Sequence, residues 1–329
     1  MAIDSRSRVI GIDISGAFGS GIRGGLVDGT AALLARKEAI TPSTSQQELI
    51  DTVVTMGGRL AELAQRDGAP ALALGIAVPG LLDEASGVVH RSPNLKLEEV
   101  NLGQVLQSRL KLPVFLVHDA SAGALAEYSV GAARTVSDLL LMVIGTGVGS
   151  AVISGGQILR GAYGTAGEIG HIVIDPAGSV CGCGGRGCVE TFASQTSIAR
   201  RYTLLGREAI LAEEVIAKAA TGNPAAARVW NEALGALASV IATAAALINC
   251  ELVVLSGSLN ITSSALAPLG TLLAKRINLV RLPRVEVSPL GDAAGVLGAA
   301  AIAFERGGLG DASRQWRQSS RYRSGTSQP

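Results

Sequence analysis

The chain has 329 residues, of which 48% are hydrophobic and 17% are charged. This balance excludes a protein that is disordered along its whole length, and the length accommodates one large domain or two of ordinary size. The 28 Lys and Arg residues nearly match the 27 Asp and Glu residues. No overall positive field therefore attracts a polyanion, and we expect no direct contact with nucleic acid.

Neither a membrane span nor a secretory leader is expected. The strongest apolar run, residues 233–248, is shorter than the roughly 20 apolar residues that cross a bilayer, so it predicts a buried helix. The N-terminus lacks the apolar stretch and the small-residue cleavage site of a signal peptide. We therefore predict a cytoplasmic protein with no membrane attachment.

The first half of the chain alternates strands with helices. Residues 9–14 predict a strand that returns through a glycine-rich turn into a second strand at 22–27. Apolar side chains at helical spacing predict a helix over 45–65. Short β-branched runs predict further strands at 72–78 and 114–117. This alternation indicates an α/β architecture.

The second half begins with a similar hairpin. A strand at 139–144, a glycine-rich turn at 145–149 and a strand at 151–154 repeat the first arrangement. Two such hairpins predict two related α/β domains that face one cleft, which we divide into residues 1–120 and 121–305.

The C-terminal part contains a predicted strand at 252–255 and an apolar helix at 293–305. We expect this last helix to pack back toward the N-terminal domain. Residues 306–329 are rich in Ser, Gly and Arg without an apolar period, which predicts a mobile tail.

Three of the four cysteines are clustered. Cys181, Cys183 and Cys188 fall within eight residues, and His171 precedes them by ten. Three thiolates and an imidazole suit tetrahedral Zn²⁺ and leave no open position for substrate, so a structural site is favoured over a catalytic one. The alternative is three unliganded thiols in a glycine-rich loop. Cys250 lies alone in an apolar stretch and is interpreted as a small core residue.

The segment Glu168-Ile-Gly-His171 and the cysteine loop that ends at Glu190 resemble the signature of the ROK family (repressor, open reading frame, kinase). The resemblance covers nearly the whole chain and includes Asp13, Pro79-Gly80, Ser92-Pro93-Asn94-Leu95, His118-Asp119-Ala120, residues 145–149 and residues 291–299. It implies the actin-like, hexokinase-type (ribonuclease H-like) fold, with duplicated α/β domains flanking a cleft that binds sugar and ATP. Because proteins resembling this one usually form homodimers, we expect a homodimer.

Phosphoryl transfer to a sugar hydroxyl requires a carboxylate near that hydroxyl and Mg²⁺ with the ATP. Asp119 follows the predicted strand at 114–117, where open α/β sheets gather their ligands. We expect it to act as the general base. A second interpretation makes Asp119 the N-cap of a helix that starts near Ser121, and the two roles are compatible.

The resemblance also implies which side chains contact the sugar: Asn94, Glu168, His171 and Glu190. His118 stands where the family commonly has Asn, and we include it as a sugar contact. His171 would use one ring nitrogen for zinc and the other for a hydroxyl, so that zinc shapes the sugar site without entering the reaction. The alternative for Glu168 and Glu190 is ordinary surface charge.

The nucleotide and phosphate contacts are expected at Asp13, Gly16, Gly145, Thr146, Gly147 and Gly257. Two loops on this side depart from the family pattern. Ser15 and Ala17 replace a Gly and a Thr of the first phosphate loop, and Leu-Ser-Gly-Ser-Leu at 255–259 replaces a triple-glycine run. Extra side chains restrict the close approach of backbone to phosphate.

Two functions remain in competition. The first is a glucokinase-like sugar kinase that phosphorylates glucose or a related hexose, with either ATP or polyphosphate as donor. The second is a catalytically impaired sugar-binding regulator or sensor whose nucleotide site is degenerate. The family's repressors carry a helix-turn-helix before the first hairpin, whereas this chain reaches its first strand at Val9, so we expect no direct DNA reading.

Overall fold

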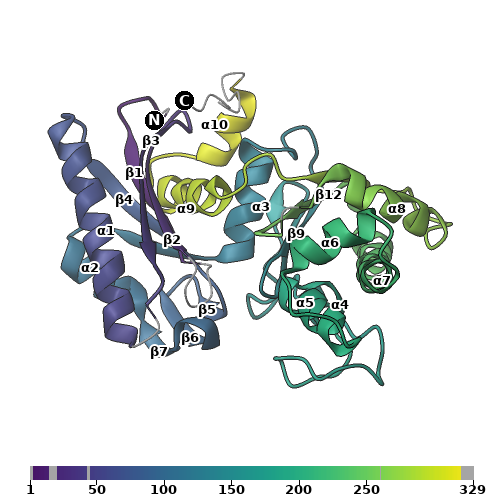
Figure 1. Ribbon diagram of the computed structural model, residues 1–329. Coiled ribbons are helices and arrows are strands. Elements are labelled where there is room, and N and C mark those ends of the chain that lie inside the picture. Colours follow the sequence, from purple (N-terminus) through teal and green to yellow (C-terminus); the bar gives the residue numbers. More distant parts are fainter. Residues whose placement is uncertain (1–2, 15–20, 43–44, 260, 320–329) are drawn as a thin grey trace. The chain divides into compact units, whose positions relative to one another are not determined.

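The computed structural model describes residues 3–14, 21–42, 45–259 and 261–319. The chain forms two compact units, each assembled from separate stretches of sequence (Figure 1). The first unit comprises Met1–Thr135, Arg160–Thr165 and Asp292–Pro329, and the second comprises Val136–Leu159 and Ala166–Gly291.

A five-stranded mixed sheet forms the centre of the first unit. Its strands are β1 (Arg8–Asp13), β2 (Gly21–Asp28), β3 (Leu33–Ile40), β4 (Ala71–Val78) and β8 (Val114–His118), in the order β3-β2-β1-β4-β8. β2 pairs antiparallel with β1 and β3, while β1, β4 and β8 run parallel. Asp13 pairs with Ala77, and Val78 pairs with His118. The polar residues that end β1 and β8 therefore lie at one edge of the sheet.

Helices cover both faces of this sheet (Figure 1). They are α1 (Gln46–Arg66) and α2 (Leu102–Leu110) on one side, and α3 (Asp119–Ser129) and α9 (Ala293–Arg306) on the other. α1 begins after Ser45, whose hydroxyl accepts the N–H of Glu48. α9 lies directly on the backbone of β4, because a Cβ at Gly75 would stand 1.8 Å from the carbonyl oxygen of Ala299.

A small antiparallel sheet follows β4 in the first unit. Its strands are β5 (Leu81–Asp83), β6 (Val88–Ser92) and β7 (Leu97–Asn101), in that order. A 3-10 turn at Pro93–Leu95 joins β6 to β7. This turn carries Asn94.

The second unit repeats the central arrangement of the first. Its strands are β9 (Leu139–Ile144), β10 (Val148–Ser154), β11 (Gln157–Ile158), β12 (Leu252–Ser256) and β13 (Arg284–Val287), in the order β11-β10-β9-β12-β13. β9 pairs antiparallel with β10, and β12 runs parallel to both β9 and β13. Each unit thus combines an antiparallel hairpin with parallel strands, as the two predicted hairpins indicated.

The helices of the second unit are α4 (Glu190–Ala193), α5 (Gln195–Leu204), α6 (Ala212–Ala220), α7 (Pro224–Ile248) and α8 (Ser263–Ala274). Among the described residues, α7 has the length and composition of a membrane span, with half of its most apolar window buried. The helix is longer than the predicted 233–248 because Asn223 caps it and Pro224 occupies its first turn. Its buried side chains, including Trp230 and Leu237, belong to the core of this unit. A core helix meets the same length criterion.

The C-terminal segment differs from the expected tail. After α9 the chain forms a second helix, α10 (Ala312–Gln318). Trp316 is 1% exposed, packs edge-on against Phe304 at 5.9 Å between ring centroids and donates its indole N–H to the carbonyl of Gly29 at 2.9 Å. The large aromatic side chain of Trp316 anchors this helix. Because one large apolar residue creates no helical period in the sequence, the helix was not predicted. Residues 320–329, with Arg321 and Arg323, lie outside the described part.

The domain division also differs from the one at residue 120. α3 packs against α9 within the first unit, so the first unit continues to Thr135. The helix predicted at 293–305 belongs to the same unit and contacts β1 and β4.

Candidate functional site

Asp119 lies where β8 passes into α3. Its side chain is 24% exposed, and its Oδ1 stands 3.4 Å from Nδ1 of His118 and accepts the N–H of Ala120 at 2.7 Å. The helix begins at Asp119 itself, with His118 as the N-cap residue. The interpretation of Asp119 as the N-cap is therefore wrong by one residue. Its carboxylate remains part of the first turn, where the helix dipole favours negative charge.

Asp13 ends β1 on the same sheet edge and is 5% exposed. The first turn of α9 contacts this carboxyl group so closely that a Cβ at Gly295 would stand 2.2 Å from Oδ2. A helix N-terminus offers partial positive charge to a buried carboxylate. The phosphate-loop residues that follow, Ser15, Gly16 and Ala17, lie outside the described residues.

Asn94 belongs to the same unit, in the turn between β6 and β7. Its side chain is exposed, while the neighbouring Ser92 and Leu95 are buried. The turn is therefore anchored on both sides of Asn94, which presents the amide to solvent.

In the second unit, His171, Cys181, Cys183 and Cys188 come together, with one ligand atom of each residue within 4.8 Å of all the others. Cys181 Sγ lies 3.6 Å from Nδ1 of His171, and Cys183 Sγ lies 3.8 Å from Cys188 Sγ. This donor set of three sulfurs and one imidazole fits a four-coordinate zinc ion.

Burial raises the pKa of two of the thiols in this cluster. It raises the pKa of Cys181 to about 12 and is also the main cause of the raised pKa of Cys188. The N–H of Gly185 lowers the pKa of the more exposed Cys183. A coordinated metal deprotonates a thiol outright, so a cation would offset the cost that burial imposes on the two sulfur anions.

His171 has its two ring nitrogens on different groups. Nδ1 is the atom near Cys181, while Nε2 lies 3.9 Å from Oε2 of Glu168. The imidazole is 34% exposed and the Glu168 side chain 43% exposed. The ring therefore joins the cysteine loop to a carboxylate that solvent or a ligand can reach.

Glu190 is half-buried and joins two loops. Its Oε1 accepts the thiol of Cys181 at 3.4 Å, and its Oε2 accepts the N–H of Val148 at 3.0 Å. These contacts do not fit the alternative of an ordinary surface charge. The N–H of Val148, in the turn at 145–149, thus donates to a carboxylate, while Gly145, Thr146 and Gly147 of this turn stay predicted phosphate contacts.

The predicted nucleotide residues of the second unit lie close together. Gly145, Thr146 and Gly147 form the turn between β9 and β10. Gly257 follows β12 with a φ of 110°, and a Cβ there would stand 2.3 Å from the carbonyl oxygen of Ile144. Only glycine meets both requirements.

Gln195 holds these two loops and was missed by the sequence analysis. Its backbone N–H donates to the carbonyl of Gly145 at 2.8 Å, and its Oε1 accepts the hydroxyl of Ser258 at 3.0 Å. Ser258 is one of the side chains that depart from the triple-glycine pattern, and here it takes part in fixing the loop. Nothing local to Gln195 in the sequence signals this role.

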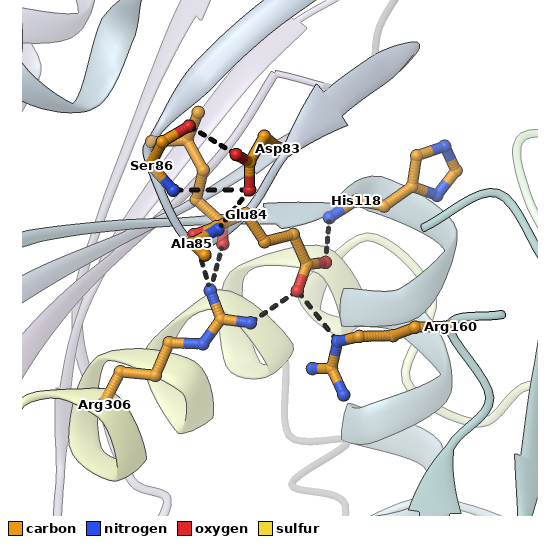
Figure 2. Close-up of polar contacts among 8 residues, drawn as sticks. Asp83, Glu84, Ala85, Ser86, His118, Arg160 and Arg306 are labelled. Carbon is orange, nitrogen blue, oxygen red and sulfur yellow. Dashed lines mark hydrogen bonds and ion pairs between the residues drawn. The ribbon is translucent and has the colours of Figure 1, made fainter. Parts of the chain in front are cut away.

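A second missed group surrounds Glu84, in the turn after β5 (Figure 2). Its Oε1 accepts the backbone N–H of His118 at 3.1 Å, and its Oε2 accepts Nε of Arg160 at 3.1 Å and Nη2 of Arg306. Burial raises the pKa of Glu84, but the His118 N–H and the two guanidinium groups outweigh it, so the pKa lies below its usual range. The carboxylate is therefore charged near neutral pH.

The chain is similar to known sugar kinases and to known transcriptional regulators. A model of the ROK family matches residues 9–306. The chain is 33% identical over 319 residues to a glucokinase of Thermotoga maritima, a match covering 91% of this chain and 98% of that protein. It is 31% identical over 252 residues, or 74% of this chain, to the DNA-binding transcriptional dual regulator NagC of Escherichia coli. The chain spans less than two thirds of the length of these curated regulators and repressors, between 32% and 62%.

Two solved structures are similar over nearly the whole chain. A ROK hexokinase from Thermus thermophilus has a TM-score of 0.80 at 30% identity. The match covers 92% of this chain and 100% of the hexokinase chain. A ROK glucokinase from Streptomyces griseus, solved with glucose and AMPPNP, has a TM-score of 0.76 at 27% identity, covering 91% and 100%. These matches confirm the expected hexokinase-type α/β fold class.

Proposed function

The chain belongs to the ROK family, and from this premise we propose that it is a sugar kinase that transfers the γ-phosphoryl group of ATP to a hydroxyl of glucose or a related hexose. The observation that carries the proposal is the Asp119 carboxylate, part-exposed at the first turn of α3 and beside His118. A carboxylate at the carboxyl end of a parallel strand is suited to accept a substrate proton. The near-complete match to a glucokinase supports it.

In this proposal Asp119 accepts the proton of the attacking sugar hydroxyl. The hydroxyl oxygen forms a bond to the γ-phosphorus, the bond from that phosphorus to the β–γ bridging oxygen breaks, and ADP leaves. Mg²⁺ bound with the nucleotide would neutralise charge on the phosphates. Asp13 lies on the sheet edge of Asp119, and we assign it to the phosphate side together with Gly16, Gly145, Thr146, Gly147 and Gly257.

We assign sugar recognition to Asn94, His118, Glu168, His171 and Glu190, since amide, imidazole and carboxylate groups hydrogen-bond sugar hydroxyls. His171 supports this assignment because Nε2 faces Glu168 while Nδ1 faces the cysteines. A structural Zn²⁺ held by His171, Cys181, Cys183 and Cys188 would fix the ring orientation. Glu190 contacts both Cys181 and Val148, so fewer of its lone pairs are left to accept a sugar hydroxyl.

The second candidate is a sugar-binding regulator with a degenerate nucleotide site. Two observations favour it: the chain matches transcriptional regulators as well as kinases, and the Val148 amide in the second glycine-rich turn is occupied by Glu190. Ser15 and Ala17 in the first phosphate loop add to this argument. Homodimer formation and a cytoplasmic location stay predictions under either function.

The test is an ADP-release assay over a panel of hexoses and N-acetylated hexoses, with formation of the sugar phosphate measured instead when polyphosphate replaces ATP as the donor. Asp119→Asn should lower kcat by about 10²- to 10⁴-fold, because the amide does not accept the hydroxyl proton. The matched control is Asp67→Asn, which changes an exposed carboxylate paired with Arg8 at the opposite end of β1 and should leave kcat unchanged. Calorimetric sugar binding without nucleotide binding or turnover would favour the regulator instead.

A further inference from the structure

We propose that Glu84 is a positioning residue for Asp119: its carboxylate fixes the backbone of His118 where β8 passes into α3, and so holds the Asp119 side chain where it accepts the sugar proton. This inference rests on the proposed function of Asp119 as the general base. It assigns a role to a side chain that the sequence analysis did not single out.

The start of α3 is capped by a side chain from outside the helix. A helix start is commonly fixed by a Glu or Gln at the third helical position, whose side chain accepts the N–H of the N-cap residue. Here the N-cap is His118, without a side-chain cap bond of its own, and the third helical position is Ser121, which is too short for that contact. Glu84 supplies the carboxylate from a distant turn, with Oε1 at 3.1 Å from the His118 nitrogen.

Glu84 is itself held in place by an arginine. Arg306, at the end of α9, donates Nη2 to the Glu84 carboxylate and Nη1 to the carbonyls of Glu84 and Leu116 at 3.0 Å each. One planar guanidinium thus binds the side chain and backbone of Glu84 and the backbone of β8 (Figure 2). The Glu84 side chain is 15% exposed, so water screens these ionic bonds weakly.

The segment Arg160–Thr165 belongs to the first unit, although the chain on both sides of it belongs to the second. Arg160 donates Nε to the Glu84 carboxylate at 3.1 Å. The segment is therefore tied to the carboxylate that fixes the start of α3. From Thr165 the chain continues to Glu168, a proposed sugar contact. The Glu84 carboxylate therefore binds both this segment, through Arg160, and the start of α3 that carries Asp119.

The test compares Glu84→Ala with Glu84→Gln in the full-length protein. Displacement of a reacting group by about 1 Å can cost roughly 100-fold in rate, so Glu84→Ala should lower kcat about 10- to 100-fold with the KM values for sugar and ATP within about threefold. Glu84→Gln keeps an oxygen acceptor for the His118 N–H and should recover most of kcat. Recovery by this variant separates positioning of His118 from loss of the negative charge.

The matched control is Glu232→Ala in the second unit. Glu232 also accepts hydrogen bonds from two arginines, Nη2 of Arg201 and, at 3.1 Å, Nε of Arg228, and neither arginine is a proposed site residue. This variant should leave kcat unchanged. Equal losses of kcat in Glu84→Ala and Glu232→Ala, or a Glu84→Ala variant with wild-type kcat, would overturn the inference.

Hydrogen exchange of the peptide that covers residues 114–122 gives a readout independent of activity. The His118 and Asp119 amides should exchange at least about tenfold faster in Glu84→Ala than in the wild-type protein and in Glu232→Ala, because removing a hydrogen-bond acceptor opens the helix start. Unchanged exchange would overturn the inference. If the wild-type protein transfers no phosphoryl group to any sugar, the proposed function fails, and the exchange result still decides whether Glu84 holds this turn.

Discussion

At the residue scale, single carboxylates and one imidazole connect loops that carry proposed site residues. Glu190 contacts Cys181 and the amide of Val148, and His171 lies between Cys181 and Glu168. These side chains therefore fix the positions of neighbouring residues in addition to any contact with a ligand. A zinc ion at the cysteine cluster would fix the orientation of His171 and therefore affect sugar binding from outside the reaction.

We predict that Cys183→Ser lowers zinc content well below one equivalent and weakens sugar binding about tenfold, because removing a ligand loosens the imidazole. Cys183 is exposed, unlike Cys181 and Cys188, so its replacement disturbs packing least. Metal analysis and sugar titration calorimetry would measure both effects, with Cys250→Ala as the control that keeps all four ligands. Loss of zinc with unchanged sugar affinity would contradict the orienting role of the metal.

At the scale of elements, the sheet of the first unit depends on direct backbone contact with α9. Gly75 of β4 stands against Ala299, with no room for a side chain between strand and helix. α9 also contacts β1 and α3, the elements that carry Asp13 and Asp119. The position of this helix therefore determines the geometry of the whole sheet edge.

We predict that Gly75→Ala lowers the free energy of unfolding by about 1–3 kcal/mol, because the added methyl group forces strand and helix apart. Gly58→Ala is the matched control: it lies inside α1 with no atom within 4 Å of an added Cβ, and should stabilise the protein by up to about 1 kcal/mol. Denaturant unfolding would measure both. A Gly75→Ala variant with the wild-type free energy of unfolding would show that β4 and α9 accommodate the added methyl group without loss of stability.

At the scale of the whole molecule, the first unit is closed by segments from both ends of the chain. Gln315 of α10 accepts the N–H of Ile3 at 3.1 Å, and Trp316 donates to Gly29 in the turn after β2. The C-terminal helix therefore stabilises the first hairpin, whose opposite end carries Asp13.

We predict that Trp316→Ala destabilises the protein by about 3–5 kcal/mol, since it leaves a cavity beside Phe304 and removes a buried hydrogen bond. Leu279→Ala, at a residue that is 97% exposed, should change the stability by less than about 0.5 kcal/mol. Thermal unfolding of both variants would give the comparison. Equal melting temperatures would mean that α10 contributes nothing to the first unit.

The hairpins, the parallel strands, the apolar helices and the cluster of His171 with three cysteines could all be predicted from the amino-acid sequence. Each of these rests on residues that are neighbours in the chain, so spacing and periodicity reveal them. The folded chain was needed to see that α10 packs, that Val148 donates to Glu190, and that Glu84 contacts Arg306, 222 residues away. Such contacts leave no local pattern, because their energy depends on burial and geometry that arise when distant segments pack together.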